Sequence, residues 1–199
     1  MRKLLQDDFD NLCDWIKRNK IEKVGLLILK LCTNDLILRT VTNNDIDEVA
    51  RMWDFENGSI PIDEAQEAID YMTDNHKKNR VGCIHHLCLA VSEKGKDTFI
   101  GWCGLDGETV GKLHIFYSID KAFRNKGYAT QCAEKLLSYA FDVAQVPFVN
   151  GGCDKNNIAS YRVMEKIGMI KDCYDENGDP LFFISKEMYQ EISNNINCL

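Results

Sequence analysis

The chain has 199 residues, of which 45% are hydrophobic and 28% are charged, a composition typical of a folded globular protein. This length fits one domain of roughly 100–200 residues with a small appendage. The net charge of −7 argues against a nucleic-acid-binding protein, because such a protein needs a basic face.

The nine cysteines contain no CxxC pair, and an odd number does not complete a disulfide framework. No apolar leader follows Met1, and the apolar run over residues 24–29 is far shorter than the roughly 20 residues of a membrane span. These features predict a cytoplasmic protein with free thiols, with no metal and with neither a membrane nor a nucleic acid as partner.

Residues 1–32 are predicted to form a helical N-terminal extension that packs on the main domain. Its first part carries apolar residues at helical spacing, and residues 24–32 are apolar enough to be buried. The main domain is expected to span residues 33–190, followed by a tail over 191–199. The apolar residues at helical spacing are Leu5, Phe9, Leu12 and Ile16.

The main domain is expected to open with a strand around residues 36–38 and two helices. The first helix covers about 43–55, with Asn43 or Asn44 as its N-cap, and the second covers about 63–79. Apolar periodicity then changes, and residues 85–120 are predicted to form a meander of three antiparallel strands.

The second half is predicted to alternate helices and strands. A helix begins at Gly127, a strand covers 146–152, a helix over 157–167 ends at Gly168, and a hairpin over 169–188 closes the chain. The whole order predicts an α/β (α+β) fold. Its sheet is mixed and largely antiparallel, with six to seven strands flanked by about four helices.

The segment "RNKGYAT", residues 124–130, joins a predicted strand to a predicted helix. Lys121, Arg124 and Lys126 gather positive charge there, although the chain is acidic overall. Gly127 lets an anion approach the backbone, and the first N–H groups of the helix have no partner within the helix. The segment therefore fits a phosphate group. A turn with solvated cations and no ligand is the alternative.

A second segment, residues 154–169, contains polar residues at the start of a predicted helix. Asn157 can cap this helix. Ser160 then lies in the first turn and faces the cleft above the sheet. The alternative is that both residues only cap the helix, as such residues often do.

Together these segments resemble the GNAT acetyltransferases, and within them the RimJ/RimL-like branch. The family's pyrophosphate loop reads Arg/Gln-x-x-Gly-x-Gly/Ala, and this chain has Arg124-x-x-Gly127-x-Ala129. The branch's later helix reads Asn-x-x-Ser, followed by Glu-Lys-x-Gly-Phe. Here Asn157-x-x-Ser160 is followed by "EKIGM", with Met in place of Phe. The resemblance covers about residues 33–188.

The resemblance implies a GNAT fold and acetyl-CoA as the acetyl donor. Strand 114–119 would separate from its parallel neighbour, and the pantetheine arm would lie in the gap. Main-chain groups of Ser118 and Ile119 and the side chain of Asn157 would bind the arm, and Ser160 would stand near the thioester sulfur. The pyrophosphate would be held by the loop residues Arg124, Asn125, Lys126, Gly127, Tyr128, Ala129 and Thr130.

The reaction also needs a base, because the acceptor amine must be neutral to attack. Deprotonation at pH 7 costs roughly 4.6 kcal/mol for a lysine-like amine and about 1 kcal/mol for an α-amine. His114 stands where the branch often has Glu and would suit this role near neutral pH. A histidine with a purely structural role is the alternative, and Asp106 and Glu108 are weaker candidates.

The family's usual acid is a tyrosine at the position that Met164 occupies here. Tyr161 lies near the same helix face but is not equivalent, so Ser160 is the better candidate for a hydroxyl near the sulfur. A histidine pair, His85 and His86, is predicted to be structural, since neighbours in a strand point to opposite faces and cannot ligate one metal.

The resulting hypothesis is a cytoplasmic N-acetyltransferase that moves an acetyl group from acetyl-CoA to a primary amine. The acceptor is a protein N-terminal α-amine or a small-molecule amine, selected by residues 43–79 and by the closing hairpin. One alternative is a sensor with the same fold that binds acyl-CoA without turnover, and another is a structural protein that binds nothing at the cationic turn. A homodimer is left open.

Overall fold

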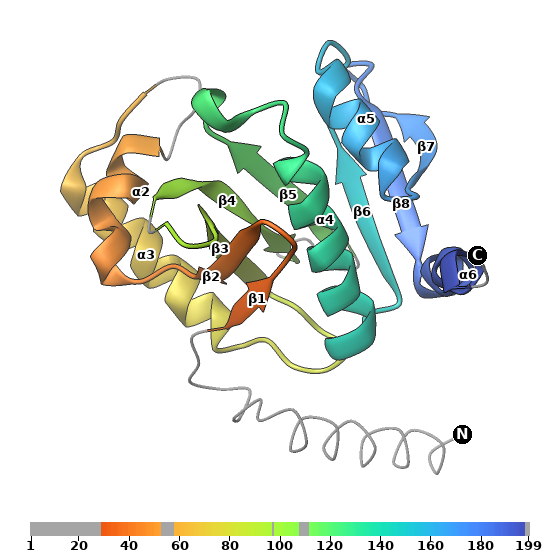
Figure 1. Ribbon diagram of the computed structural model, residues 1–199, viewed down its shortest axis with the longest axis horizontal. Helices are drawn as coiled ribbons and strands as arrows, with labels where there is room; N and C mark the ends of the chain where they lie inside the picture. Colours follow the sequence, from red (N-terminus) through yellow and green to blue (C-terminus); the bar gives the residue numbers. More distant parts are fainter. Residues whose placement is uncertain (1–28, 53–57, 97, 108–111, 198–199) are drawn as a thin grey trace.

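The computed structural model describes residues 29–52, 58–96, 98–107 and 112–197. The described strands form one sheet in the order β1-β2-β3-β4-β5-β6-β8-β7 (Figure 1). All neighbouring strands are antiparallel except β5 and β6. The structure confirms the predicted α/β class, with eight strands in the sheet instead of six to seven.

The strands and helices have the following bounds. The eight strands are β1 (Lys30–Cys32), β2 (Leu36–Thr40), β3 (His86–Glu93), β4 (Phe99–Asp106), β5 (His114–Ile119), β6 (Phe148–Gly152), β7 (Ile170–Tyr174) and β8 (Pro180–Ser185). The helices in the described residues are α2 (Ile46–Met52), α3 (Ile62–His76), α4 (Tyr128–Ser138), α5 (Ile158–Lys166) and α6 (Lys186–Asn197).

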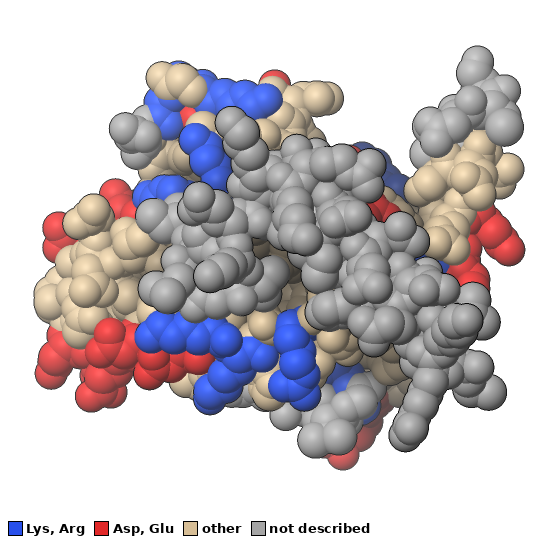
Figure 2. Space-filling view, turned by 90° about the horizontal axis from the view of Figure 1, so that it is seen from below, with Lys and Arg blue, Asp and Glu red and all other residues tan. Residues whose placement is uncertain are grey.

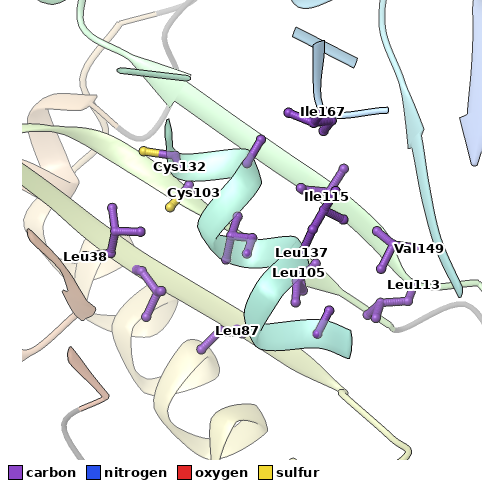
Figure 3. Close-up of a cluster of buried hydrophobic side chains, with 14 of the residues drawn as sticks. Leu38, Leu87, Cys103, Leu105, Leu113, Ile115, Cys132, Leu137, Val149 and Ile167 are labelled. Carbon is purple, nitrogen blue, oxygen red and sulfur yellow. The ribbon is translucent and has the colours of Figure 1, made fainter. Parts of the chain in front are cut away.

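Helix α4 covers one face of the sheet (Figure 1). Alternate residues of the strands point to this face, and their apolar side chains pack against the buried stripe of α4. Figure 3 shows Leu87, Leu105, Ile115 and Val149, from four neighbouring strands, around Leu137 of α4. This face of β3, β4, β5 and β6 is therefore closed by the core.

The opposite face of β3 and β4 carries α2 and α3. Their buried residues pack on Cys88 and Ala90 of β3 and on Phe99 and Trp102 of β4. Phe116 of β5 contacts the edge of this second core. The sheet thus has a closed side under α4 and a side that α2 and α3 cover in part.

The first helix begins differently from the prediction. Thr42, not Asn43 or Asn44, stands at the N-terminus of a short 3₁₀ turn that leads into α2. The Asp45 carboxylate accepts from the Thr42 backbone N–H at 2.8 Å and pairs with the Arg39 guanidinium through two contacts. A partly buried ion pair anchored on β2 fixes this helix start.

Two elements were not expected. β1 pairs with β2 although its residues fall within the predicted extension, and residues 1–28 lie outside the described residues. α6 occupies residues predicted as the end of the hairpin and a tail. Met188 and Tyr189 pack on the core, and the Tyr189 ring lies 5.0 Å from that of Phe141. The division of the chain at residues 32 and 190 stays a prediction.

Candidate active site

The parallel strands β5 and β6 separate soon after they meet. Their pairing is confined to His114 opposite Asn150, supported by a 2.7 Å hydrogen bond from the Asn150 N–H to the Leu113 carbonyl. Beyond this point each strand pairs on its other side, β5 with β4 and β6 with β8. The backbone edges that face each other across the gap are thus left without a ladder partner.

The hydrogen-bond ladder decides which peptide groups of β5 face the gap. The Asp120 N–H donates to the Ile100 carbonyl of β4, whereas the Leu113 carbonyl points to β6. Because antiparallel strands alternate in this way, the backbone groups of Tyr117 and Ile119 point toward the gap. The Ser118 backbone faces β4, opposite Trp102.

The cationic turn has the backbone that an anion site needs. Asn125 and Gly127 both have positive φ, at 65° and 76°, and Gly127 precedes the first residue of α4. The Gln131 N–H reaches back to the Gly127 carbonyl, which leaves the N–H groups of residues 128–130 without an acceptor inside the helix. These N–H groups and the helix dipole favour a negative charge in front of the turn.

The cations of the turn differ in their availability. The Arg124 Nε donates to the Ile119 carbonyl at 2.8 Å, which ties the loop to the end of β5. Lys126 lies 3.6 Å from the buried carboxylate of Glu93. The same carboxylate accepts from the Tyr128 hydroxyl at 2.6 Å and pairs with Lys96 at 2.8 Å. Glu93 therefore orders the loop and neutralises part of its charge.

The second segment brings its Ser160 hydroxyl next to a hydroxyl group of β5. Asn157 caps α5, with its side-chain oxygen accepting from the Ser160 N–H at 3.0 Å, while its amide nitrogen makes no hydrogen bond to the described residues. The Ser160 hydroxyl lies 2.9 Å from the Tyr117 hydroxyl, which is also 3.3 Å from the Ser160 carbonyl. A tyrosine of β5 thus reaches across to the first turn of α5.

Sequence reasoning missed Tyr117. The alternation of β5 places its side chain on the α4 face, but its contact with Ser160 joins residues 43 positions apart. Burial is the main cause that raises the pKa of Tyr117 to about 12, against a smaller opposite effect of the Ser160 hydrogen bond. Neither of the two α5 positions compared with the family's acid replaces it: the Tyr161 ring packs on Phe182 at 5.1 Å, and Met164 is a buried residue without a hydroxyl group.

His114 lies on the other side of the sheet. Leu113 and Ile115, its neighbours in sequence, face α4, so His114 faces away from it, opposite Asp106 of β4. Burial lowers the pKa of His114 below its ordinary value, Lys112 adds to this, and Asp106 opposes it. The imidazole is therefore neutral near pH 7. Of the two weaker candidates, Asp106 lies opposite His114, and Glu108 lies outside the described residues.

His86 lies in strand β3, unlike its neighbour His85, and its side chain packs against aromatic rings. Its ring lies between those of Tyr71 and Phe116, with centroids 5.4 and 6.0 Å away. Within the described part of the chain, no group of three or more His, Cys, Asp or Glu residues could hold a metal ion. No described helix is long and apolar enough to cross a membrane.

Cysteines in the described residues are all free thiols, from Cys32 to Cys173. Cys153 directly follows β6, and its half-buried thiol lies on the Ser160 side of the gap. Burial raises its pKa and nearby Asp179 adds to this, while a hydrogen bond from Ser160 acts in the opposite direction. A thiol and two hydroxyl groups therefore lie close together on one side of the sheet, and the His114 imidazole lies on the other side where β5 and β6 meet.

A mixed sheet with one splayed parallel pair, followed by a glycine-containing turn at the start of a helix, is the arrangement expected of the GNAT acetyltransferases. Residues 35–170 match the sequence profile of the acetyltransferase (GNAT) domain, and the chain belongs to this family. It is an acyltransferase, and its sheet and helices form the GNAT fold.

Two curated bacterial relatives cover most of the domain. The chain is 27% identical over 145 residues to the uncharacterized N-acetyltransferase YjdG of Bacillus subtilis (strain 168), which is 71% of this chain and 86% of the relative. It is 23% identical over 150 residues to the uncharacterized N-acetyltransferase p20 of Bacillus licheniformis, which is 71% of this chain and 83% of the relative.

Solved structures support the fold alone. The ribosomal-protein-S5-alanine acetyltransferase of Vibrio fischeri matches with a TM-score of 0.66 and 15% identity, over 80% of this chain and 97% of that one. RimL, a ribosomal L7/L12 α-N-protein acetyltransferase solved with coenzyme A joined to a cysteine by a disulfide, matches with a TM-score of 0.64 and 14% identity. That match covers 79% of this chain and 98% of RimL.

Proposed function

We propose that this acyltransferase moves the acetyl group of acetyl-CoA to a primary amine by direct attack on the thioester. The observation that carries the proposal is the gap between β5 and β6, which has the anion turn at one end and the Ser160–Tyr117 pair beside it. The coenzyme A bound to RimL adds support for the donor. We also propose that the chain belongs to the RimJ/RimL-like branch of the family.

The donor would be bound mostly by backbone groups. Free N–H groups of residues 128–130 and the φ-positive turn at Asn125 and Gly127 hold the pyrophosphate, with Arg124 fixing the loop to β5. The pantetheine arm lies in the gap, where it pairs with the backbone of Tyr117 and Ile119. The free amide nitrogen of Asn157 donates to it from α5, and Ser118 borders it on β5.

His114 is the proposed general base. The acceptor amine approaches from the α2 and α3 face, gives a proton to the neutral imidazole and attacks the thioester carbonyl. Figure 2 shows Asp and Glu side chains gathered at the left end of the molecule, where α2 and α3 lie. These carboxylates attract a cationic amine to this face. The exposed acidic residues of α3 are Asp63, Glu64, Glu67, Asp70 and Asp74.

The Ser160 hydroxyl donates a hydrogen bond to the sulfur of the leaving thiolate and keeps its proton. Tyr117 then donates to the Ser160 oxygen and fixes the orientation of the serine hydroxyl. A tyrosine with a pKa of about 12 does not give its proton to a thiolate whose conjugate acid has a pKa near 8.5. Tyr117 is therefore a positioning residue.

Replacing either hydroxyl should lower kcat, because each change removes the same oriented hydrogen bond to the leaving sulfur. We expect a loss of about tenfold for Ser160→Ala and slightly less for Tyr117→Phe, with acetyl-CoA affinity changed less than twofold. The double variant should be no slower than Ser160→Ala, since residues that act through one contact are not additive. Steady-state kinetics and calorimetry measure these quantities. Losses that multiply would show that the two hydroxyl groups act separately.

Release of coenzyme A tests the proposed function itself. The chain, supplied with acetyl-CoA and a panel of peptides, polyamines, aminoglycosides and amino acids, should release free thiol in step with acetylated product. Binding of acetyl-CoA with no thiol release for any amine would favour the acyl-CoA sensor. An unchanged melting temperature with acetyl-CoA would favour a protein that binds nothing at the turn.

A further inference from the structure

Four polar side chains form a row across the sheet at the closed end of the gap. His86 is opposite Asp106, Asp106 is opposite His114, and His114 is opposite Asn150. Residues that are opposite one another in neighbouring strands point to the same face, with Cβ atoms about 5 Å apart. This polar row therefore crosses β3, β4, β5 and β6 without a break.

The core shows which face the row occupies. Each member of the row has an apolar neighbour in sequence that packs under α4, as Figure 3 shows for Leu87, Leu105, Leu113 and Val149. The polar row must point the other way, toward the side on which α2 and α3 lie. This is the side from which the acceptor amine approaches His114.

One end of the polar row is fixed by packing. The His86 ring is held between Tyr71 of α3 and Phe116 of β5, and its Nδ1 lies 3.7 Å from the Asp106 carboxylate. Gly104, two residues before Asp106, has no side chain, and an added Cβ there would lie 2.4 Å from the Phe116 ring. These contacts hold the His86 ring next to Asp106, which is opposite His114, although the His86 Nδ1 has no hydrogen-bond partner among the described residues.

The other end of the row holds a donor without an acceptor. The side-chain nitrogen of Asn150 is covered and has no hydrogen-bond partner among the residues that the structure describes. A buried donor left in this state costs about 1–3 kcal/mol, which a ligand that accepts its hydrogen bond would offset. Asn150 stands where β5 and β6 part, next to His114 in the polar row, so its side chain lies at the closed end of the gap.

We propose that Asn150 recognises the acceptor, and that the acceptor is an amine with an oxygen atom on the carbon next to the one that bears the nitrogen. The inference rests on the proposed function, because it needs His114 to take the proton of that amine. In such a molecule the nitrogen and oxygen are about 3 Å apart, a spacing that two neighbouring side chains in a row can bridge. Amino carbonyl and amino alcohol compounds share this chemistry.

Three amines on one carbon frame separate these sources. Alaninamide carries a carbonyl, 2-aminopropan-1-ol carries a hydroxyl, and isopropylamine carries a methyl group at the same place. Asn150→Leu keeps a similar volume but removes the donor. This variant should lower kcat/KM about three- to tenfold for the amine whose oxygen accepts from Asn150. The kcat/KM for isopropylamine should stay the same. Ratios of variant to wild type for each amine cancel the differences in amine pKa.

Calorimetry with acetyl-CoA is the control, and we expect the affinity to be unchanged in Asn150→Leu. Asn150→Ala serves as a second variant if the leucine disturbs folding, judged by thermal melting. An equal loss for all three amines, or weaker acetyl-CoA binding, would overturn the inference while the proposed function stood. Failure of the wild type to acetylate any amine would overturn both.

Discussion

Gly127→Asp should abolish acetyl-CoA binding in a chain that still folds. The carboxylate would face the pyrophosphate at the mouth of α4, where two unit charges about 4 Å apart repel by roughly 4 kcal/mol at an effective dielectric constant near 20. This is a loss in affinity of about 1,000-fold. An added Cβ at residue 127 meets no atom within 4 Å, so the fold has room for the side chain.

Gly127→Asn is the matched control for this change. Asparagine has the same size as aspartate and tolerates the positive φ of 76° better than most residues, but it carries no charge. We expect it to weaken acetyl-CoA binding less than tenfold by calorimetry. Equal affinities of the Asp and Asn variants would show that no phosphate group lies in front of this turn.

His114→Ala should remove the acidic limb of the pH–rate profile. The base is active when neutral, and the His114 pKa lies below its ordinary value because of burial and Lys112. In the wild type, kcat/KM should therefore rise with pH through a pKa below 6.5. The variant should lose about 100- to 10,000-fold in kcat/KM, the usual contribution of a general base.

A lysine-like acceptor separates its own ionisation from that of His114 in this pH–rate profile. Its own pKa, about 10.4, is more than three units above that of His114, whereas an α-amine near 7.8 would overlap with it. His114→Gln keeps a polar side chain at this place and should behave like the alanine variant, because an amide takes no proton. An acidic limb that persists in both variants would exclude His114 as the base.

The sequence contains enough local information for the fold and for the conformation of the turn before α4. Gly127, with cations before it and an apolar helical stripe after it, predicts a strand–turn–helix anion site without reference to any distant residue. Asn157 and Ser160 are predicted in the same local way. α6 could have been found as well, since Met188, Tyr189 and Ile192 follow the spacing of one helix face.

Tyr117 and Asn150 could not be identified in this way, because their roles depend on contacts between segments far apart in the chain. The period of a strand places Tyr117 on the α4 face but does not show that Ser160 lies 2.9 Å from its hydroxyl. The place of Asn150 in the polar row depends on the register of four strands, and the turns and loops between them determine that register together. β1 was missed because it has three residues and, among the described strands, it pairs with β2 alone.

A crystal structure of the chain with coenzyme A tests the central claim most directly. We expect the pyrophosphate within hydrogen-bond distance of the N–H groups of residues 127–130. The pantetheine arm should lie between β5 and β6, with its sulfur beside the Ser160 hydroxyl and Tyr117 still bonded to that hydroxyl. Coenzyme A bound away from this gap, or a sulfur remote from Ser160, would contradict the account.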